Sequence, residues 1–178
     1  MASTSILLAG FGGQGVLFAG KFLAYKGMVQ GKQLSWLPSY GPEMRGGTAN
    51  CSVILSDTPV GSPIITNPDV LVAMNLPSLQ KFVDSVVPGG IIIIDSTLID
   101  AKVEREDVKV FYVPATQLAK DAEIKTLANM IIMGAVLENN PELSFEGTEA
   151  VVQKLVPPTK AALVELNMKA LTLGKEYK

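Results

Sequence analysis

The chain has 178 residues, a length typical of one compact domain with a sizeable buried core. Its formal net charge is −2 and no basic cluster stands out, so we expect no nucleic-acid partner. The sequence has no histidine and one cysteine, Cys51, which excludes disulfide frameworks, cysteine-ligated iron–sulfur clusters, histidine zinc sites and histidine-dependent nucleophiles.

Charged residues make up 18% of the chain, against a usual share of about 25%. We therefore expect part of the surface to be hidden in permanent subunit contacts, with an unusually apolar core as the alternative. No apolar run approaches the roughly 20 residues that cross a bilayer, and the N-terminus has no positive region or cleavage site. These features predict a cytoplasmic protein without a membrane partner.

The N-terminal half alternates short apolar runs with glycine and proline. Residues 5–10 predict a strand, and residues 13–30 predict a helix with apolar side chains at helical spacing. The run QLSWL predicts a second strand. Residues 48–55 alternate apolar and polar side chains; because a turn and the run VGSPII follow, we expect an antiparallel hairpin near 48–65.

The second half begins with strands and ends with helices, and we find no repeat or linker in it. Three further strands are predicted, at DVLVAMN, IIIID and DVKVFYVP, and LPSLQKFVDSV predicts a short helix after the first of them. The run VEREDVK predicts a solvated loop. The helical C-terminal part covers about 115–178, with helices at 115–122, 125–138, 146–155 and 158–174.

These elements predict a single α/β domain over residues 1–178. We expect a three-layer α/β/α arrangement with a mixed, mostly parallel sheet and a Rossmann-like start.

The first loop carries the glycine pattern G-x-G-x-x-G at Gly10, Gly12 and Gly15. Such a loop lets backbone approach a pyrophosphate at a helix N-terminus. An acidic residue about 20 positions later normally binds the ribose, but the first carboxylate here is Glu43, so NAD and FAD are disfavoured. NADP stays open through Lys32 or Arg45. The glycines either permit a tight turn only, or let backbone N–H groups and Gln14 face a phosphate or a partner's cofactor.

A second glycine-rich loop follows, SYGPEMRGG. Its glycines bend the backbone and its prolines restrict it, which predicts a stiff loop presenting Glu43, Met44 and Arg45. Presentation to a partner or an anion is one interpretation. An internal Glu43–Arg45 pair with an exposed tip is the other.

Taken together, several runs resemble one family. GFGGQGVLFAGKFLA, SYGPEMRGGTANCSVILSD, LVAMN, PGGIIIID and LANMIIMGAVLE, spread over residues 6–138, resemble the gamma subunit of the 2-oxoacid:ferredoxin oxidoreductases, most closely its 2-oxoglutarate branch.

The resemblance implies a multi-subunit enzyme that converts a 2-oxoacid to acyl-CoA and CO2. Thiamine diphosphate lies between the alpha and beta subunits, iron–sulfur clusters pass electrons to ferredoxin, and coenzyme A takes the acyl group. This chain would bind no cofactor alone and would lack catalytic residues and metal ligands. It would pack on alpha and beta, with a ferredoxin-like delta subunit as a further partner, and help enclose the coenzyme A side of the site.

The resemblance implies that the two glycine-rich loops and two asparagines lie at the contact with the partners or coenzyme A. Arg45 of the second loop would pair with a coenzyme A phosphate or with a carboxylate of a partner subunit. A structural amide bonded to nearby backbone is the alternative for both asparagines. The candidate cofactor-binding or interface residues are Gly10, Phe11, Gly12, Gly13, Gln14, Gly15, Tyr40, Glu43, Met44, Arg45, Gly46, Gly47, Asn75 and Asn129.

Two other residues are predicted to be structural: Cys51 as a core residue and Asp95 as a cap, with a ribose-binding or catalytic acid as the alternative for Asp95. Two rival functions also stay open. One is a free-standing nucleotide-binding oxidoreductase, and the other is a purely structural assembly subunit.

Overall fold

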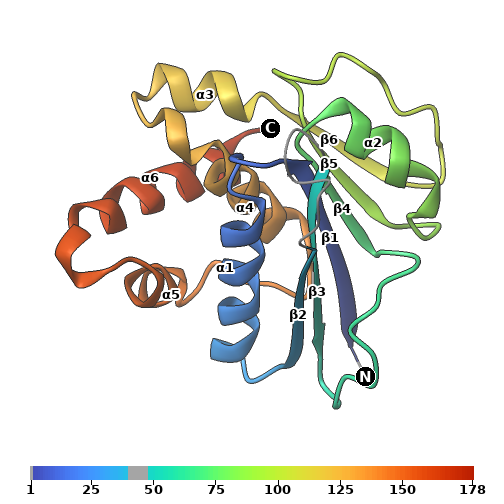
Figure 1. Ribbon diagram of the computed structural model, residues 1–178, viewed down its shortest axis with the longest axis horizontal. Helices are drawn as coiled ribbons and strands as arrows, with labels where there is room; N and C mark the ends of the chain where they lie inside the picture. Colours follow the sequence, from blue (N-terminus) through green and yellow to red (C-terminus); the bar gives the residue numbers. More distant parts are fainter. Residues whose placement is uncertain (1, 40–47) are drawn as a thin grey trace.

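The computed structural model describes residues 2–39 and 48–178 and is built on a central six-stranded sheet (Figure 1). The strand order is β2-β3-β1-β4-β5-β6. The strands are β1 (Ser3–Phe11), β2 (Gln33–Ser39), β3 (Thr48–Ser56), β4 (Val70–Ala73), β5 (Ile91–Asp95) and β6 (Lys109–Val113).

Strands β1, β4, β5 and β6 run parallel to one another, whereas β3 lies between β1 and β2 and is antiparallel to both. The parallel strands are apolar runs because helices or loops cover both of their faces; β4 is buried at every position. The predicted mixed, mostly parallel sheet with a Rossmann-like start is confirmed.

The expected hairpin near 48–65 is wrong. Strand β3 pairs with β1 and β2, and no strand forms in residues 57–69. Pro59, Gly61, Pro63 and Pro68 fall within that segment. Proline has no backbone N–H to add to a ladder and fixes its own φ angle, so this segment crosses to β4 as an irregular connection.

The two faces of the sheet are covered unequally (Figure 1). Most helices lie on one face, and α2 covers the other beside β4–β6. The α-helices are α1 (Val16–Val29), α2 (Leu76–Phe82), α3 (Ala115–Asp121), α4 (Ala128–Asn139), α5 (Thr148–Leu155) and α6 (Ala162–Glu176), with short 3-10 turns η2 (Val83–Ser85), η3 (Lys125–Leu127) and η4 (Pro158–Lys160).

Helix α4 is the centre of the helical layer, and its residues 129–137 are all buried. It packs tightly against α6, because Gly134 faces the backbone carbonyl of Leu171 and Gly174 faces that of Ile131. A methyl group at either glycine would overlap the facing carbonyl oxygen. This close contact explains why α4 is apolar on all sides.

The run VEREDVK is irregular up to the start of β6 and most of its charged side chains are exposed, as predicted for a solvated loop, but it is also anchored to the core. Val103 and Val108 pack on the core beneath α2, and the Val103 N–H donates to Tyr112 Oη at 2.9 Å. Arg105 donates to the carbonyls of Val83 and Val86 at 2.9 and 2.8 Å. The segment therefore covers part of the α2 face of the sheet.

Candidate functional site

The glycine loop joins the carboxyl end of β1 to the first turn of α1. Gly13 and Gly15 have φ angles of 91° and 74°, which favour glycine. Gly15 caps α1 without a side-chain bond, and the first turn has no acidic residue. The N–H groups of this turn therefore give the loop a partial positive charge, which favours an anion.

Gln14 is bonded at both ends of its side-chain amide. Its Oε1 accepts the Phe11 N–H at 2.6 Å, and its Nε2 donates to the Met74 carbonyl at 2.9 Å. A Cβ on Gly10 would lie 2.6 Å from Gln14 Oε1. The amide thus lies directly over the first glycine of the pattern and ties the loop to the end of β4.

Asn129 fixes the loop from the helical layer. Its Nδ2 donates to the Gly15 carbonyl at 3.1 Å, and a Cβ on Gly15 would clash with that amide. Its Oδ1 is buried and has no partner in the described residues. Gly15 is therefore required both by its positive φ and by the approach of Asn129.

Asn75 lies at the carboxyl end of β4 and caps α2, where its Oδ1 accepts the Ser78 N–H at 2.9 Å. The Nδ2 of Asn75 and the Oγ of Ser78 are buried without a partner in the part of the chain that the structure describes. Both predicted asparagines thus bond to backbone, as expected of structural amides, and each keeps one free polar atom.

A hollow of about 260 Å³ opens on the outer side of the loop. It is lined by Phe11, Gly12, Gly13, Gly15, Val16, Leu17, Phe18 and Ala49. No atom of the described residues lies within 4 Å of the place where a Cβ on Gly13 would stand. The hollow therefore combines backbone N–H groups with an apolar wall, which suits a phosphate joined to an apolar or planar group.

Dinucleotide binding of the usual kind does not fit this edge. Because β3 lies between β2 and β1, the end of β2 where a ribose-binding acid would stand is not beside the loop. Lys32 precedes β2 at the opposite edge, where its Nζ contacts Asp57 at 2.6 Å and Glu142 at 3.3 Å. The bond to Asp57 raises the pKa of Lys32. The alternative that NADP binds through Lys32 is therefore not supported, because Lys32 pairs with Asp57 and Glu142 away from the glycine loop.

Cys51 and Asp95 have structural surroundings. Cys51 is fully buried beneath α1, and burial raises the pKa of its thiol to about 12, so the reactive thiolate does not form near neutral pH. Asp95 is buried at the end of β5 and accepts hydrogen bonds from the Thr97 N–H and, at 2.6 Å, from Thr116 Oγ1. It joins β5 to α3.

The second predicted loop lies outside the described residues. Tyr40, Glu43, Met44, Arg45, Gly46 and Gly47 all belong to it. Their roles stay predictions. In the described ranges, no group of three acidic or cysteine side chains is placed to hold a metal ion, and no helix is long and apolar enough to span a bilayer.

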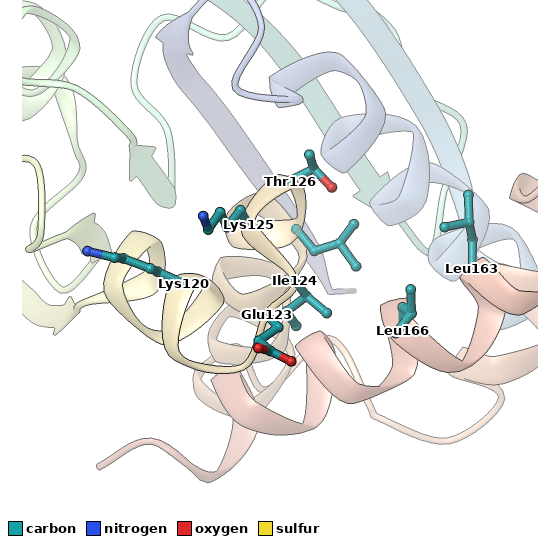
Figure 2. Close-up of a pocket in the computed structure, with 8 residues that line it drawn as sticks. Lys120, Glu123, Ile124, Lys125, Thr126, Leu163 and Leu166 are labelled. Carbon is teal, nitrogen blue, oxygen red and sulfur yellow. The ribbon is translucent and has the colours of Figure 1, made fainter.

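Sequence reasoning missed a larger cavity of about 590 Å³ between the end of α3 and α6 (Figure 2). Leu163 and Leu166 project from α6 and line the cavity together with Ile124, while the ammonium of Lys120 points away from them. Leu166 is 38% exposed. The sequence pattern that could have indicated it is the pair Leu163 and Leu166, which lie on one face of a helix because they are three positions apart. In the described part of the structure, only the short turn η3 and the residues next to it cover that face.

Comparisons with known proteins agree on a family. Residues 5–177 match pyruvate ferredoxin/flavodoxin oxidoreductase. The ketoisovalerate oxidoreductase subunit VorA of Methanothermobacter thermautotrophicus is 41% identical over 97% of this chain, but the chain spans only 36% of VorA. The 2-oxoglutarate synthase subunit KorC of the same organism is 35% identical over 96% of this chain and 93% of its own length.

Two solved structures share the fold. The gamma subunit of a keto/oxoacid ferredoxin oxidoreductase from Geobacter sulfurreducens has a TM-score of 0.85 and 32% identity, over 99% of this chain and 96% of that one. The 2-oxoglutarate:ferredoxin oxidoreductase of Magnetococcus marinus has a TM-score of 0.87 and 24% identity, over 98% of this chain and 31% of that one. By sequence over nearly its whole length, and by fold, this chain belongs to the pyruvate ferredoxin/flavodoxin oxidoreductase family.

Proposed function

We propose that this chain is the gamma component of a 2-oxoacid:ferredoxin oxidoreductase complex that converts a 2-oxoacid to acyl-CoA and CO2. The family match across residues 5–177 carries the proposal. The chain has no histidine, and its single cysteine is buried with a raised pKa, so neither residue type supplies a nucleophile here. Its contribution is to pack on the catalytic alpha and beta subunits and to shape their site.

The proposed substrate is 2-oxoglutarate. The KorC subunits support this assignment because they match over nearly their whole length, at 32–35% identity. Ketoisovalerate is a second candidate, favoured by the 41% identity to VorA. Turnover of the complex with each acid, at equal coenzyme A, decides between them.

Coenzyme A fits the outer hollow of the glycine loop. The first turn of α1 offers uncapped N–H groups and carries no acid, and Gly13 leaves the approach open. When bound, coenzyme A supplies the thiol that takes the acyl group. The proposed role of this chain is to hold a phosphate of that ligand at the α1 N-terminus, with Arg45, which lies outside the described residues, as a second proposed contact.

The other cofactors of such complexes do not fit this chain. A cluster needs several cysteine ligands, and the sequence has one. The sequence also lacks the G-D-G run of thiamine diphosphate sites. In this proposal those groups belong to the partner subunits, which are alpha, beta and a ferredoxin-like delta subunit. The cytoplasmic location of the complex stays a prediction.

The test compares Gly13→Asp with Gly13→Asn in a complex reconstituted with the catalytic subunits. Both variants bear the same strain at a positive φ, which Asn and Asp tolerate better than other residues, and they differ only by one negative charge. We expect Gly13→Asp to raise the coenzyme A KM about tenfold over Gly13→Asn, with assembly and kcat unchanged.

Other outcomes would reassign the chain. If the two variants assemble normally and have equal KM values for coenzyme A, the chain does not contact coenzyme A at this loop, and the function that remains is that of a purely structural assembly subunit. Tight binding of NAD(P) or FAD by the full chain alone, measured by isothermal titration, would favour a free-standing oxidoreductase and contradict the proposal.

A further inference from the structure

The carboxyl ends of β1 and β4 form the position at which open α/β sheets usually bind ligands. The two strands are parallel neighbours, but α1 leaves β1 toward one face of the sheet and α2 leaves β4 toward the other. Figure 1 shows the two helices on opposite sides of the sheet. A crevice forms where successive connections diverge in this way, and dinucleotides occupy it in related folds.

In this chain the side chain of Gln14 crosses that position. It starts from the loop after β1, accepts the Phe11 N–H, and donates to the carbonyl of Met74 at the end of β4. The Met74 N–H in turn donates to the Ala9 carbonyl at 2.9 Å. We call this set of contacts the Gln14 latch; it closes the gap between the two strand ends with groups of the chain itself.

The latch also occupies the space that a pyrophosphate needs. The Oε1 of Gln14 is 2.6 Å from where a Cβ on Gly10 would stand, and Met74 Cβ is 3.0 Å from the same point. In dinucleotide-binding loops, glycines leave such space so that phosphate oxygens can approach backbone. Here an amide oxygen already fills it and already takes the Phe11 N–H that a phosphate oxygen would accept.

We propose that Gln14 is a specificity-determining and positioning residue that keeps dinucleotides out of the β1–β4 crevice and fixes the glycine loop in one form. The strand order is an independent observation in the same direction, because among the described residues β3 lies beside β1 in the place that a ribose-binding β2 usually takes. This inference goes beyond the proposed function, because it concerns contacts within the glycine loop itself and holds whether or not coenzyme A binds there.

Three variants of the full chain test the latch. Gln14→Ala removes both hydrogen bonds and the filling amide. Gln14→Glu keeps the size and the acceptor for Phe11 but turns a carboxylate oxygen toward the Met74 carbonyl. Gln153→Ala is the matched control, because Gln153 is an exposed glutamine of α5 that bonds only to Glu149.

Hydrogen exchange of the Phe11 amide reports the positioning role. We expect exchange to be about tenfold faster in Gln14→Ala, because the loss of about one hydrogen bond changes the opening equilibrium by roughly that factor. In Gln14→Glu and Gln153→Ala the rate should stay close to that of wild type. Unchanged exchange in Gln14→Ala overturns the latch.

Inorganic pyrophosphate, titrated calorimetrically, reports the exclusion. We expect it to bind Gln14→Ala at least tenfold more tightly than wild type, and Gln14→Glu no more tightly than wild type. Equal affinity for wild type and Gln14→Ala overturns the exclusion, and the proposal requires both results. Should Gln14→Ala fail to fold, Gln14→Asn is too short to reach both partners and takes its place in both measurements.

Discussion

Two glycines of the helical layer, Gly134 and Gly174, and one glycine of the β1–α1 loop, Gly13, have opposite surroundings. A methyl group on Gly134 would overlap the Leu171 carbonyl and one on Gly174 that of Ile131. A methyl group on Gly13 would meet nothing within 4 Å, although its φ of 91° is unfavourable for other residues. The first kind lets two backbones pack, whereas the second leaves backbone open to something outside the chain.

The largest effect should follow from adding a methyl group between α4 and α6. Gly134→Ala and Gly174→Ala each force two helix backbones apart, so we expect a loss of about 3 kcal/mol or more in the free energy of unfolding. Urea unfolding measures it. Gly61→Ala is the control, because that glycine is exposed with nothing within 4 Å. Losses below about 1 kcal/mol would show that the two helices separate easily.

A smaller effect is expected where the neighbour is a side chain. A Cβ on Gly20 would overlap the Cys51 sulfur, so we expect Gly20→Ala to lose about 2 kcal/mol. Removing the sulfur relieves the clash, and the double variant with Cys51→Ala should recover at least about 1 kcal/mol in a double-mutant cycle. Additive losses would mean that the Trp36 ring, which is also close, is the obstacle.

The smallest predicted effect in the helical layer depends on pH. Lys26 is buried in α1 and donates to the Glu146 carbonyl. Burial lowers its pKa below the ordinary value of 10.5, against the opposing effect of the Glu146 charge. Between the lowered pKa and 10.5 the unfolded chain binds more protons, so stability rises with pH in this window.

We therefore expect the free energy of unfolding of wild type, relative to Lys26→Met, to rise with pH over the alkaline range that ends at the ordinary lysine pKa of 10.5. Lys21→Met, an exposed position of the same helix, should show no such difference from wild type. A constant difference between wild type and Lys26→Met across this range would mean that Lys26 keeps its ordinary pKa.

Much of this fold could be predicted because its elements have strong local patterns. The apolar runs of β4 and β5 and the helical spacing of the C-terminal part locate these elements to within a few residues. Their partners are set by pairings between distant residues, which local patterns do not record. The place of β3 between β1 and β2, and the irregular path of residues 57–69, followed from such pairings.

The candidate site was predictable in position but not in internal contacts. The spacing of Gly10, Gly12 and Gly15 located the loop at a strand–helix junction. The bond from Gln14 to Met74 spans 60 positions and that from Asn129 to Gly15 spans 114, so neither could be read from the motif. The cavity beside Leu166 likewise depends on how α6 lies against the end of α3.

The central place of β1 has a consequence for synthesis of the protein. This strand is synthesised before both of its partners: one of its edges pairs with residues 48–56 and the other with residues 70–73. Until residue 73 has emerged, the nascent chain holds an apolar strand with at least one open edge. Such long-range closure slows folding and exposes the strand to wrong pairing, so newly made chains are most vulnerable to aggregation in this interval.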